Sequence, residues 1–341
     1  MNDRYSRQEL FSPIGKEGQQ QLVKKHVVII GAGALGTGTS EALVRAGVGK
    51  VTIMDRDYVD WSNLQRQQLY SEEDAKLRLP KAIAAKKRLE QVNCDVQIEA
   101  MVTDVTVNVL EELVKKGKPD VLIDATDNFD TRMVINDISQ KYGIPWIYGA
   151  CVGSYGVSYP FIPGKTPCLH CLLETLPMNG LTCDTAGIIS PAVQMVAAYQ
   201  VAETLKILVG DIDAVRRKLI SFDVWKNQQS MIDVNSLKRE DCPSCGTHQT
   251  YPFLSYEHQT KTEVLCGRNT VQIRPAIKGP RDLDELAKVL SRQGGNVEKN
   301  PYLVSLEVPE HRLVVFKDGR VLVHGTKDIQ EAKTLYHRYL G

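Results

Sequence analysis

Asn63, Arg66, Gln67 and Lys81 follow closely on a glycine-rich segment, and together these side chain types could manage phosphate chemistry. A planar guanidinium and an ammonium hold several phosphate oxygens and stabilise the negative charge that moves onto departing pyrophosphate. Arg66 or Lys81 taken alone would equally be a solvated surface cation. Because they occur together after a glycine turn, they favour phosphoryl chemistry. A dehydrogenase would have no need for these residues.

The glycine turn must be positioned by a buried strand and a helix. Residues 26–31, HVVIIG, are apolar on both faces, which is typical of a parallel strand between helix layers. Gly31, Gly33 and Gly36 form a G-x-G-x-x-G turn: the first permits the tight turn, the second removes a side chain that would block a phosphate or ribose, and the third lets the helix from Ala34 pack closely. This pattern suits NAD, FAD or ATP equally well.

Two carboxylates are expected at the same edge of the sheet. Asp55 ends the strand KVTIMD, where a carboxylate accepts hydrogen bonds from both ribose hydroxyls. Asp127 follows a strand beginning at Asp120, whose carboxyl end should face the same crevice. Asp124 is the competing candidate on that strand. Asp127 could instead cap the helix that starts near Phe129, a role that Asn128 or Asp130 could also take.

Two C-x-x-C pairs, Cys168 with Cys171 and Cys242 with Cys245, form the second strong signal. Four thiolates at this spacing predict a closed, structural, tetrahedral zinc site. Disulfides are less favoured, because no signal peptide precedes the chain and cytosolic thiols are kept reduced. His170, inside the first pair, is expected to be a spacer.

The order of elements predicts an α/β fold with a doubly wound, Rossmann-like, mostly parallel sheet, continued by antiparallel strands over 154–163 and 218–225. We expect an ATP-binding domain with structural zinc over residues 1–249. Tyr155, Tyr159 and Phe161 lie on the antiparallel part, either as docking aromatics or, more commonly for such a pattern, as core.

The composition changes near residue 250, and 250–341 is predicted to be a small α+β domain. Its pattern indicates a strand over 263–275, a helix within 282–295, a strand at 302–308, a hairpin turning at Lys317 to Gly319, and a last helix over 328–340. It has no cysteine on an anion-binding loop, which excludes a rhodanese domain. Its role stays open between a packing or dimer-supporting appendage and a docking site for a carrier or sulfur donor.

Several motifs occur in a recognisable order: RYSRQ at Arg4 to Gln8, the glycine turn, DRDYVDWSNLQRQ from Asp55, PK at Pro80, ATDN from Ala125, and the two cysteine pairs. In this order they resemble the MoeB/ThiF-type adenylyltransferases of the ubiquitin-activating-enzyme-like family, over roughly residues 1–250. The resemblance implies that ATP adenylates the C-terminal Gly-Gly carboxylate of a ubiquitin-fold sulfur carrier, ThiS-like or MoaD-like, for thiazole (thiamine) or molybdopterin synthesis.

The resemblance also assigns roles residue by residue. Asp55 matches the ribose ligand, Asp127 the Mg²⁺ ligand, and Arg7 an arginine that reaches the phosphates from the other subunit of a homodimer. Cys183 matches a cysteine that links covalently to the carrier in some relatives, while other relatives work without it. The triphosphate ligands are matched by Asn63, Arg66 and Lys81, and the glycine turn around Gly31, Gly33, Ala34 and Gly36, with Gln67 nearby, completes the nucleotide site.

The residue types suit this reaction, because a carboxylate nucleophile with a pKa of about 3.5 is already ionised and needs no general base. The side chains have only to suppress charge repulsion and align the groups. Besides the carrier, a cysteine desulfurase or another sulfur donor is an expected partner. Alternatives are ATP-dependent activation of another carboxylate or amide, such as a tRNA base, an NAD-dependent oxidoreductase, and a non-catalytic zinc scaffold.

The charge balance and the hydropathy of the chain restrict the classes of partner that we expect. The chain of 341 residues carries 42 basic and 41 acidic side chains, a net charge of +1 that gives no footprint for nucleic acid. No apolar run approaches the roughly 20 residues that a membrane-spanning helix needs. We therefore expect a cytoplasmic enzyme.

Overall fold

The computed structural model describes residues 3–175, 187–255, 262–264, 269–274, 281–292 and 295–340. By its internal contacts the chain divides into two compact units: unit 1 comprises Met1–Lys76 and Pro80–His258, and unit 2 comprises Leu77–Leu79 and Gln259–Gly341. Within the described residues, no helix combines the length and the apolar character needed to cross a bilayer.

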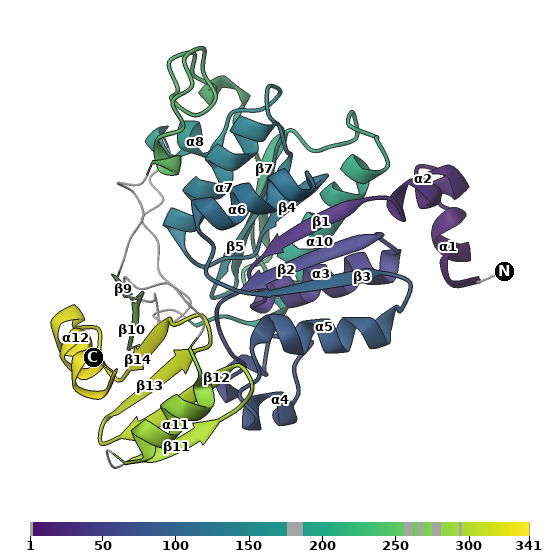
Figure 1. The fold of residues 1–341 in the computed structure, drawn as a ribbon. Helices are drawn as coiled ribbons and strands as arrows, with labels where there is room; N and C mark the ends of the chain where they lie inside the picture. Colours follow the sequence, from purple (N-terminus) through teal and green to yellow (C-terminus); the bar gives the residue numbers. More distant parts are fainter. Residues whose placement is uncertain are drawn as a thin grey trace. The chain divides into compact units, whose positions relative to one another are not determined.

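Unit 1 is built on an eight-stranded mixed sheet with the order β3-β2-β1-β4-β5-β6-β7-β8 (Figure 1). The first five strands in the chain are parallel and the last three are antiparallel. Their bounds are β1 His26–Ile30, β2 Lys50–Asp55, β3 Gln97–Val102, β4 Val121–Asp124, β5 Trp146–Val152, β6 Tyr155–Phe161, β7 Lys218–Asp223 and β8 Gln228–Asp233. The predicted doubly wound sheet with an antiparallel continuation is confirmed.

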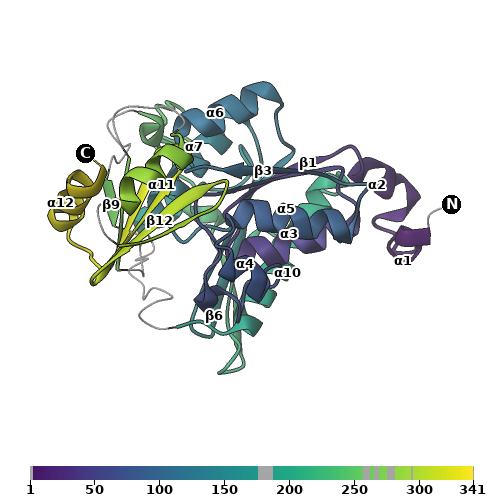
Figure 2. The same cartoon turned by 60° about the horizontal axis from the view of Figure 1, so that its bottom comes forward.

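Helices cover both faces of this sheet (Figure 2). One face carries α6 (Val107–Lys116) and α7 (Phe129–Tyr142), and the other carries α3 (Ala34–Ala46), α5 (Lys81–Val92) and α10 (Ser190–Leu208). The shorter helices are α1 Ser6–Glu9, α2 Gly15–Leu22, α4 Glu72–Lys76 and α8 Leu169–Thr175. Chain order reverses between β1 and β4, and in such sheets ligands bind in the crevice at the carboxyl ends of the strands around that point.

The sequence patterns locate most of these elements within a few residues. The helix after the glycine turn is capped at its C-terminus by Gly47, which adopts a left-handed φ of +83° that glycine tolerates best. Strand β8 is not visible in the sequence, because all six of its side chains are exposed and it carries no apolar alternation. Of the aromatics considered for docking, Tyr159 and Phe161 are fully buried core, whereas Tyr155 is 42% exposed.

Unit 2 contains a six-stranded antiparallel sheet with the order β11-β12-β13-β14-β10-β9. Its elements are β9 Thr262–Val264, β10 Thr270–Ile273, α11 Leu283–Ser291, β11 Asn296–Lys299, β12 Leu303–Val308, β13 His311–Phe316, β14 Val321–His324 and α12 Ile329–Leu340. The helices bury an aliphatic core against the sheet. The single strand predicted over 263–275 is wrong, because β9 and β10 are two strands that pair antiparallel. The hairpin turning at Lys317–Gly319 is confirmed.

Candidate functional site

The three turn glycines differ in what surrounds them. A Cβ on Gly31, whose φ is +103°, would lie 2.4 Å from the carbonyl oxygen of Ala125, and a Cβ on Gly36 would lie 2.0 Å from the carbonyl oxygen of Gly31. These two positions are fixed by close backbone packing. At Gly33 the nearest heavy atom to such a Cβ is Nε2 of Gln67, at 4.0 Å. The space over Gly33 is therefore open, as an approach path for a ligand requires.

Asp55 locks the end of β2 to the turn. Its Oδ2 accepts a hydrogen bond from the Ala32 N–H at 2.6 Å, and its Oδ1 accepts one from the Asp57 N–H at 2.6 Å. Burial raises the pKa of Asp55, the nearby Lys81 ammonium opposes this, and Asp57 adds to it. Each carboxylate oxygen keeps a second lone pair, so that Asp55 can still accept hydrogen bonds from a ligand.

Lys81, the first residue of α5, is 3% exposed. Its backbone N–H donates to the Asp57 carbonyl at 2.8 Å, and its Nζ lies 3.5 Å from Asp57 Oδ2. That separation exceeds an ordinary N–H···O hydrogen bond, so the ammonium is attracted by Asp57 without being tightly bound to it. The side chain is thus able to turn toward a phosphate.

Tyr70 is a site residue that the sequence analysis missed. Its buried hydroxyl lies 2.6 Å from the Ala32 carbonyl and 3.2 Å from the Lys81 carbonyl, and so connects the glycine turn with the start of α5. Burial raises the pKa of Tyr70 well above its usual value, and the negative charge of Asp55 raises it further. A lone tyrosine between Leu69 and Ser71 carries no sequence signal for this role.

The segment after β2 holds the other predicted phosphate ligands. Asn63 Oδ1 accepts a hydrogen bond from the Asp60 N–H at 3.1 Å, which fixes a short turn at Trp61–Asn63. Arg66 is half-buried and donates from Nη1 to the Ser62 carbonyl at 2.8 Å. Gln67 is 3% exposed, and within the described part of the chain its buried Oε1 accepts no hydrogen bond.

The two acidic candidates at the end of β4 and just beyond it differ in their surroundings. Asp124 is fully buried, pairs with Arg132 Nε at 2.9 Å and accepts hydrogen bonds from Thr126, so its charge is already compensated by a cation. Asp127 is exposed in the loop before α7. The helix cap is Asn128, whose side chain accepts from the Thr131 N–H at 2.9 Å. Of Asp124 and Asp127, Asp127 is therefore the one whose carboxylate is available to a cation.

Arg7 is not brought to the glycine turn within the chain. Helix α1 and the turn before it pack on the far ends of α3 and α5: Gln8 Nε2 donates to the Ala46 carbonyl at 2.9 Å, and Arg4 Nη1, in the preceding turn, donates to the Val92 carbonyl at 3.0 Å. Because α3 starts at the turn and spans 13 residues, these contacts lie about 20 Å from it. Arg7 itself is exposed.

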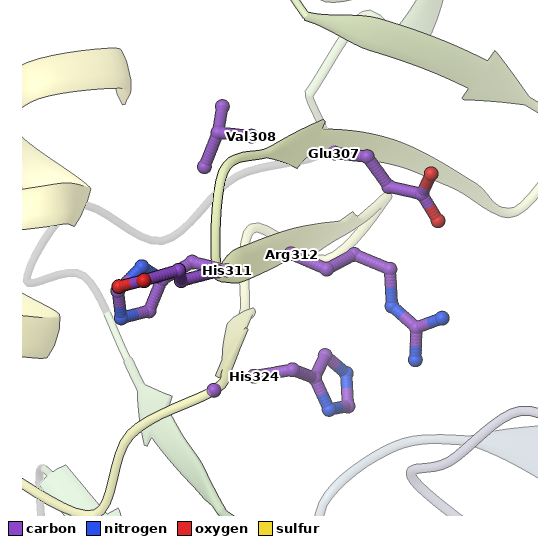
Figure 3. A pocket seen from close by; sticks show the side chains of 7 residues that line it. Glu307, Val308, His311, Arg312 and His324 are labelled. Carbon is purple, nitrogen blue, oxygen red and sulfur yellow. The ribbon is translucent and has the colours of Figure 1, made fainter.

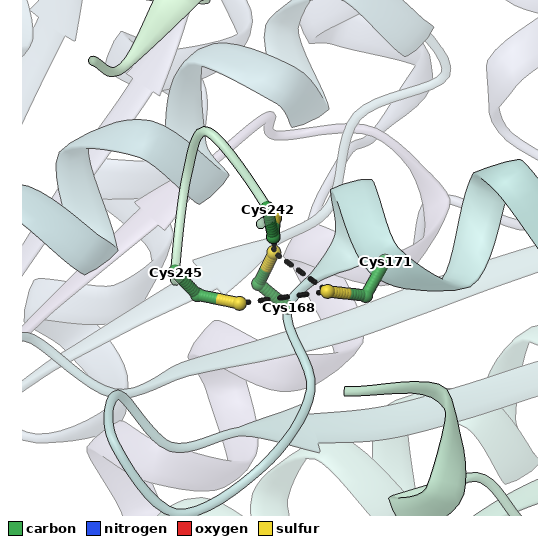
Figure 4. A group of neighbouring side chains, drawn as sticks. All are labelled: Cys168, Cys171, Cys242 and Cys245. Atoms are coloured by element: carbon green, nitrogen blue, oxygen red, sulfur yellow. Dashed lines mark hydrogen bonds between the residues drawn. The ribbon is translucent and has the colours of Figure 1, made fainter. Parts of the chain in front are cut away.

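The four cysteines of the C-x-x-C pairs converge at a separate place in unit 1 (Figure 4). Their sulfurs all lie within 4.8 Å of one another, and the hydrogen-bonded pairs are 3.5–3.9 Å apart. A tetrahedron with Zn–S bonds of about 2.3 Å has edges of about 3.8 Å, so this donor set fits zinc. His170 donates to or accepts from Ser244 and does not belong to the cluster.

Hydrogen bonds to α7 hold the segments that carry the two cysteine pairs. Asn136 Oδ1 accepts from the Leu169 N–H at 2.8 Å, and Asp137 Oδ2 accepts from the Phe253 N–H at 2.9 Å. Asp137 is fully buried, and that burial raises its pKa. Cys183, the predicted covalent residue, lies outside the described residues.

Comparisons with known proteins agree with this architecture. The ThiF family model matches residues 5–244. The chain is 56% identical to the sulfur carrier protein ThiS adenylyltransferase of Bacillus subtilis, and the match covers the whole length of both chains. It is 36% identical to the sulfur carrier protein adenylyltransferase of Thermus thermophilus, covering 78% of this chain and 96% of that one. The crystal structure of Escherichia coli MccB with ATP matches with a TM-score of 0.62 at 23% identity, over 72% of this chain and 74% of that chain, which shows a shared fold.

The unequal surroundings of the glycines predict unequal effects of substitution. Gly36→Ala should lower the free energy of unfolding by roughly 1–3 kcal/mol, because the methyl group collides with a backbone carbonyl. Gly33→Ala should lower the free energy of unfolding by less than about 1 kcal/mol, because it only replaces a glycine N-cap by alanine. It should nevertheless weaken ATP binding by about tenfold, or 1.4 kcal/mol, by filling the open space. Urea unfolding and calorimetric titration with ATP measure both effects, and unaltered ATP affinity in Gly33→Ala would contradict the ligand path.

The cysteine cluster predicts about one zinc per chain, measured by elemental analysis of the purified protein. Cys242→Ser should lose the metal and several kcal/mol of stability, because three ligands hold zinc less tightly than four. Cys94→Ser, which alters an exposed cysteine outside the cluster, is the matched control and should retain both. Zinc that survives in Cys242→Ser would remove this residue from the ligand set.

Proposed function

Because the chain belongs to the ThiF family and is an adenylyltransferase, we propose that its substrate is the C-terminal Gly-Gly carboxylate of a ubiquitin-fold sulfur-carrier protein. A carboxylate oxygen of the carrier attacks the α-phosphorus of ATP, the bond from that phosphorus to the bridging oxygen breaks, and pyrophosphate leaves. The product is an acyl-adenylate. The relatives named above, which act on sulfur carriers by their names, support this substrate class.

The observation that carries the proposal is the arrangement at the carboxyl edge of β1 and β2. Open space over Gly33 adjoins Gln67, whose buried Oε1 accepts no hydrogen bond within the described residues. A buried polar atom in this condition is costly unless a ligand or water satisfies it. Asp55 adds ribose-accepting lone pairs and Lys81 a loosely paired ammonium. Together these groups suit an adenosine with its phosphates directed toward α5.

The carboxylate of the carrier needs no activation, because it is ionised at neutral pH. What opposes the reaction is repulsion between this anion and the triphosphate. Arg66 and Lys81 reduce that repulsion and stabilise the leaving pyrophosphate by charge and position. Asp127, exposed beside this edge, is the residue we propose to hold Mg²⁺, since a carboxylate oxygen is a donor that this ion prefers. The ion would supply further positive charge to the phosphates.

The distance of α1 from the glycine turn supports a homodimer in which Arg7 reaches the phosphates of the partner subunit. Anchored about a helix length from the turn, Arg7 has no route to the phosphates of its own chain. A two-fold axis would give each site one arginine from the other subunit. Cys183 and a sulfur donor such as a cysteine desulfurase belong to the later sulfur transfer in this proposal.

Of the two sulfur-carrier pathways we propose the thiazole branch of thiamine synthesis, with a ThiS-like carrier. The support is the name of the relative that matches over the full length of both chains at 56% identity. A MoaD-like carrier of molybdopterin synthesis has the same Gly-Gly chemistry and is the direct competitor in the test below. Activation of a different carboxylate or amide on the same core is the second candidate.

Exchange of labelled pyrophosphate into ATP tests the function. We expect exchange that depends on a ThiS-like carrier ending in Gly-Gly, that disappears when the terminal glycine is removed, and that is weaker with a MoaD-like carrier. Arg66→Ala should reduce it by at least about a hundredfold, since a positioned cation at the phosphates is worth about 2.7 kcal/mol or more. Exchange without any carrier dependence would overturn the proposed substrate.

Subunit mixing tests the role of Arg7. Arg7→Ala and Arg66→Ala proteins should each be nearly inactive. After unfolding and joint refolding they should recover about a quarter of normal activity, because half of the dimers are then mixed and each has one intact site. Refolding each variant alone is the control. No recovery from the mixture would argue for action within one chain.

A further inference from the structure

The polar side chains around a hollow in unit 2 have partners within the protein. The hollow measures about 310 Å³ and is lined by Glu307, Arg312 and His324, which are cross-strand neighbours (Figure 3). Glu307 Oε1 lies 3.2 Å from Arg78 Nη2, and the His324 ring lies 2.8 Å from Thr270 Oγ1. Groups that are already paired leave little for a ligand to satisfy. The carboxyl edge of β1 and β2 in unit 1 differs in this respect.

Polar groups at the start of α3 are left for a ligand. The N-cap of α3 is Gly33, which has no side chain to accept hydrogen bonds from the first N–H groups of the helix. Within the described part of the chain, the Gly33 N–H itself has no hydrogen-bond acceptor. Gln67, which is 3% exposed and has its Oε1 unpaired among the same residues, lies beside the space over Gly33. Because N–H groups at the start of a helix attract anions, a phosphate suits this place.

The direction of the Gly33 N–H is set by the peptide group that Gly33 shares with Ala32. This peptide is trans, so its C=O and its N–H point in opposite directions. The Tyr70 hydroxyl donates to the Ala32 carbonyl at 2.6 Å, and the Gly33 N–H therefore points away from Tyr70. If the peptide turned over, its carbonyl oxygen would replace the N–H and repel a phosphate.

Other hydrogen bonds of the turn belong to the neighbouring peptides. Asp55 accepts from the Ala32 N–H, which is part of the peptide before this one. The Thr37 N–H donates to the Gly33 carbonyl at 3.0 Å, which is part of the peptide after it. A peptide can turn over between two fixed neighbours, and a glycine on one side makes this easier because it tolerates both signs of φ. The bond from Tyr70 opposes this rotation.

Tyr70 is itself well held. Its side chain is buried, and its N–H donates to the Gln67 carbonyl at 3.2 Å, which places both side chains in one short turn. The hydroxyl also lies 3.2 Å from the Lys81 carbonyl. Because a hydroxyl has a single proton, the shorter contact with Ala32 is the stronger of its two bonds.

We propose that Tyr70 is a positioning residue, which through the Ala32 carbonyl directs the Gly33 N–H toward a phosphate oxygen of ATP. The inference rests on the nucleotide site proposed above and explains how one of its donors is oriented. Tyr70 acts through the peptide group and does not itself touch the nucleotide.

The test compares ATP with adenosine, which lacks the phosphates, in Tyr70→Phe. This change removes the hydroxyl and keeps the buried ring. Affinity for ATP, measured by calorimetry, should fall by about fivefold, the size expected when one hydrogen bond to the ligand is lost. Affinity for adenosine, measured by competition with a fluorescent ATP analogue, should not change.

Tyr142→Phe is the matched control. It removes a hydroxyl that donates to Glu111 at 3.1 Å, between α7 and α6 on the other face of the sheet. Both affinities should equal those of the unaltered protein. Unaltered ATP affinity in Tyr70→Phe, or an equal loss for adenosine, would overturn the inference.

A double variant decides which of its two carbonyl partners Tyr70 acts through. In a Lys81→Ala background, Tyr70→Phe should still produce its full loss of ATP affinity, because the effect passes through Gly33 and not through the ammonium. A loss that disappears in this background would place the action at α5 and contradict the proposal. Failure of the proposed substrate would appear separately, as pyrophosphate exchange without carrier dependence in the unaltered protein, and the ATP titrations would still decide the role of Tyr70.

Discussion

The site depends on one close approach of backbone to backbone, where the turn after β1 meets the end of β4. Gly31 has no room for a side chain against Ala125, and Gly36 has none against Gly31. Because β1 pairs with both β2 and β4, this contact sets the level at which all three strands end. The proposed ligand groups are therefore positioned relative to this contact. Asp55 then fixes the turn itself by accepting the Ala32 N–H.

The charges around this contact bear on how a triphosphate could bind beside it. The nearby groups are two carboxylates, the buried Asp55 and the half-buried Asp57, and one buried ammonium, Lys81. Such a set, with more acid than base, would repel a triphosphate if it acted alone. In the reaction we propose, the extra positive charge comes from Arg66 at the boundary with solvent, from a cation at Asp127, and from Arg7 of another subunit. The proposed dimer and Mg²⁺ follow from this imbalance as much as from family resemblance.

The features that depend on residues close together in the sequence could be predicted from it. The glycine turn, the acidic strand end and the cysteine pairs each lie within a few residues, and their geometry follows from short-range sterics and ligand spacing. The features that depend on contacts between distant parts of the chain could not. Tyr70 acquires its role only because the chain returns Ala32 and Lys81 to its hydroxyl, and β8 has no apolar pattern because an edge strand with exposed side chains requires none. Likewise, nothing in the letters around Arg78 indicates partners more than 200 residues away.

The two cations proposed as phosphate ligands are held within unit 1 in different ways. Arg66 is fixed locally, by a hydrogen bond to the carbonyl of Ser62 in its own turn. Lys81 begins α5, and the first turn of a helix has no preceding turn to hold it. Its backbone is held instead by residues from other segments, because its N–H donates to the Asp57 carbonyl and its carbonyl accepts from the Tyr70 hydroxyl. The residues after β2 and the start of α5 are therefore fixed to each other, which keeps the Lys81 ammonium beside the Asp57 carboxylate.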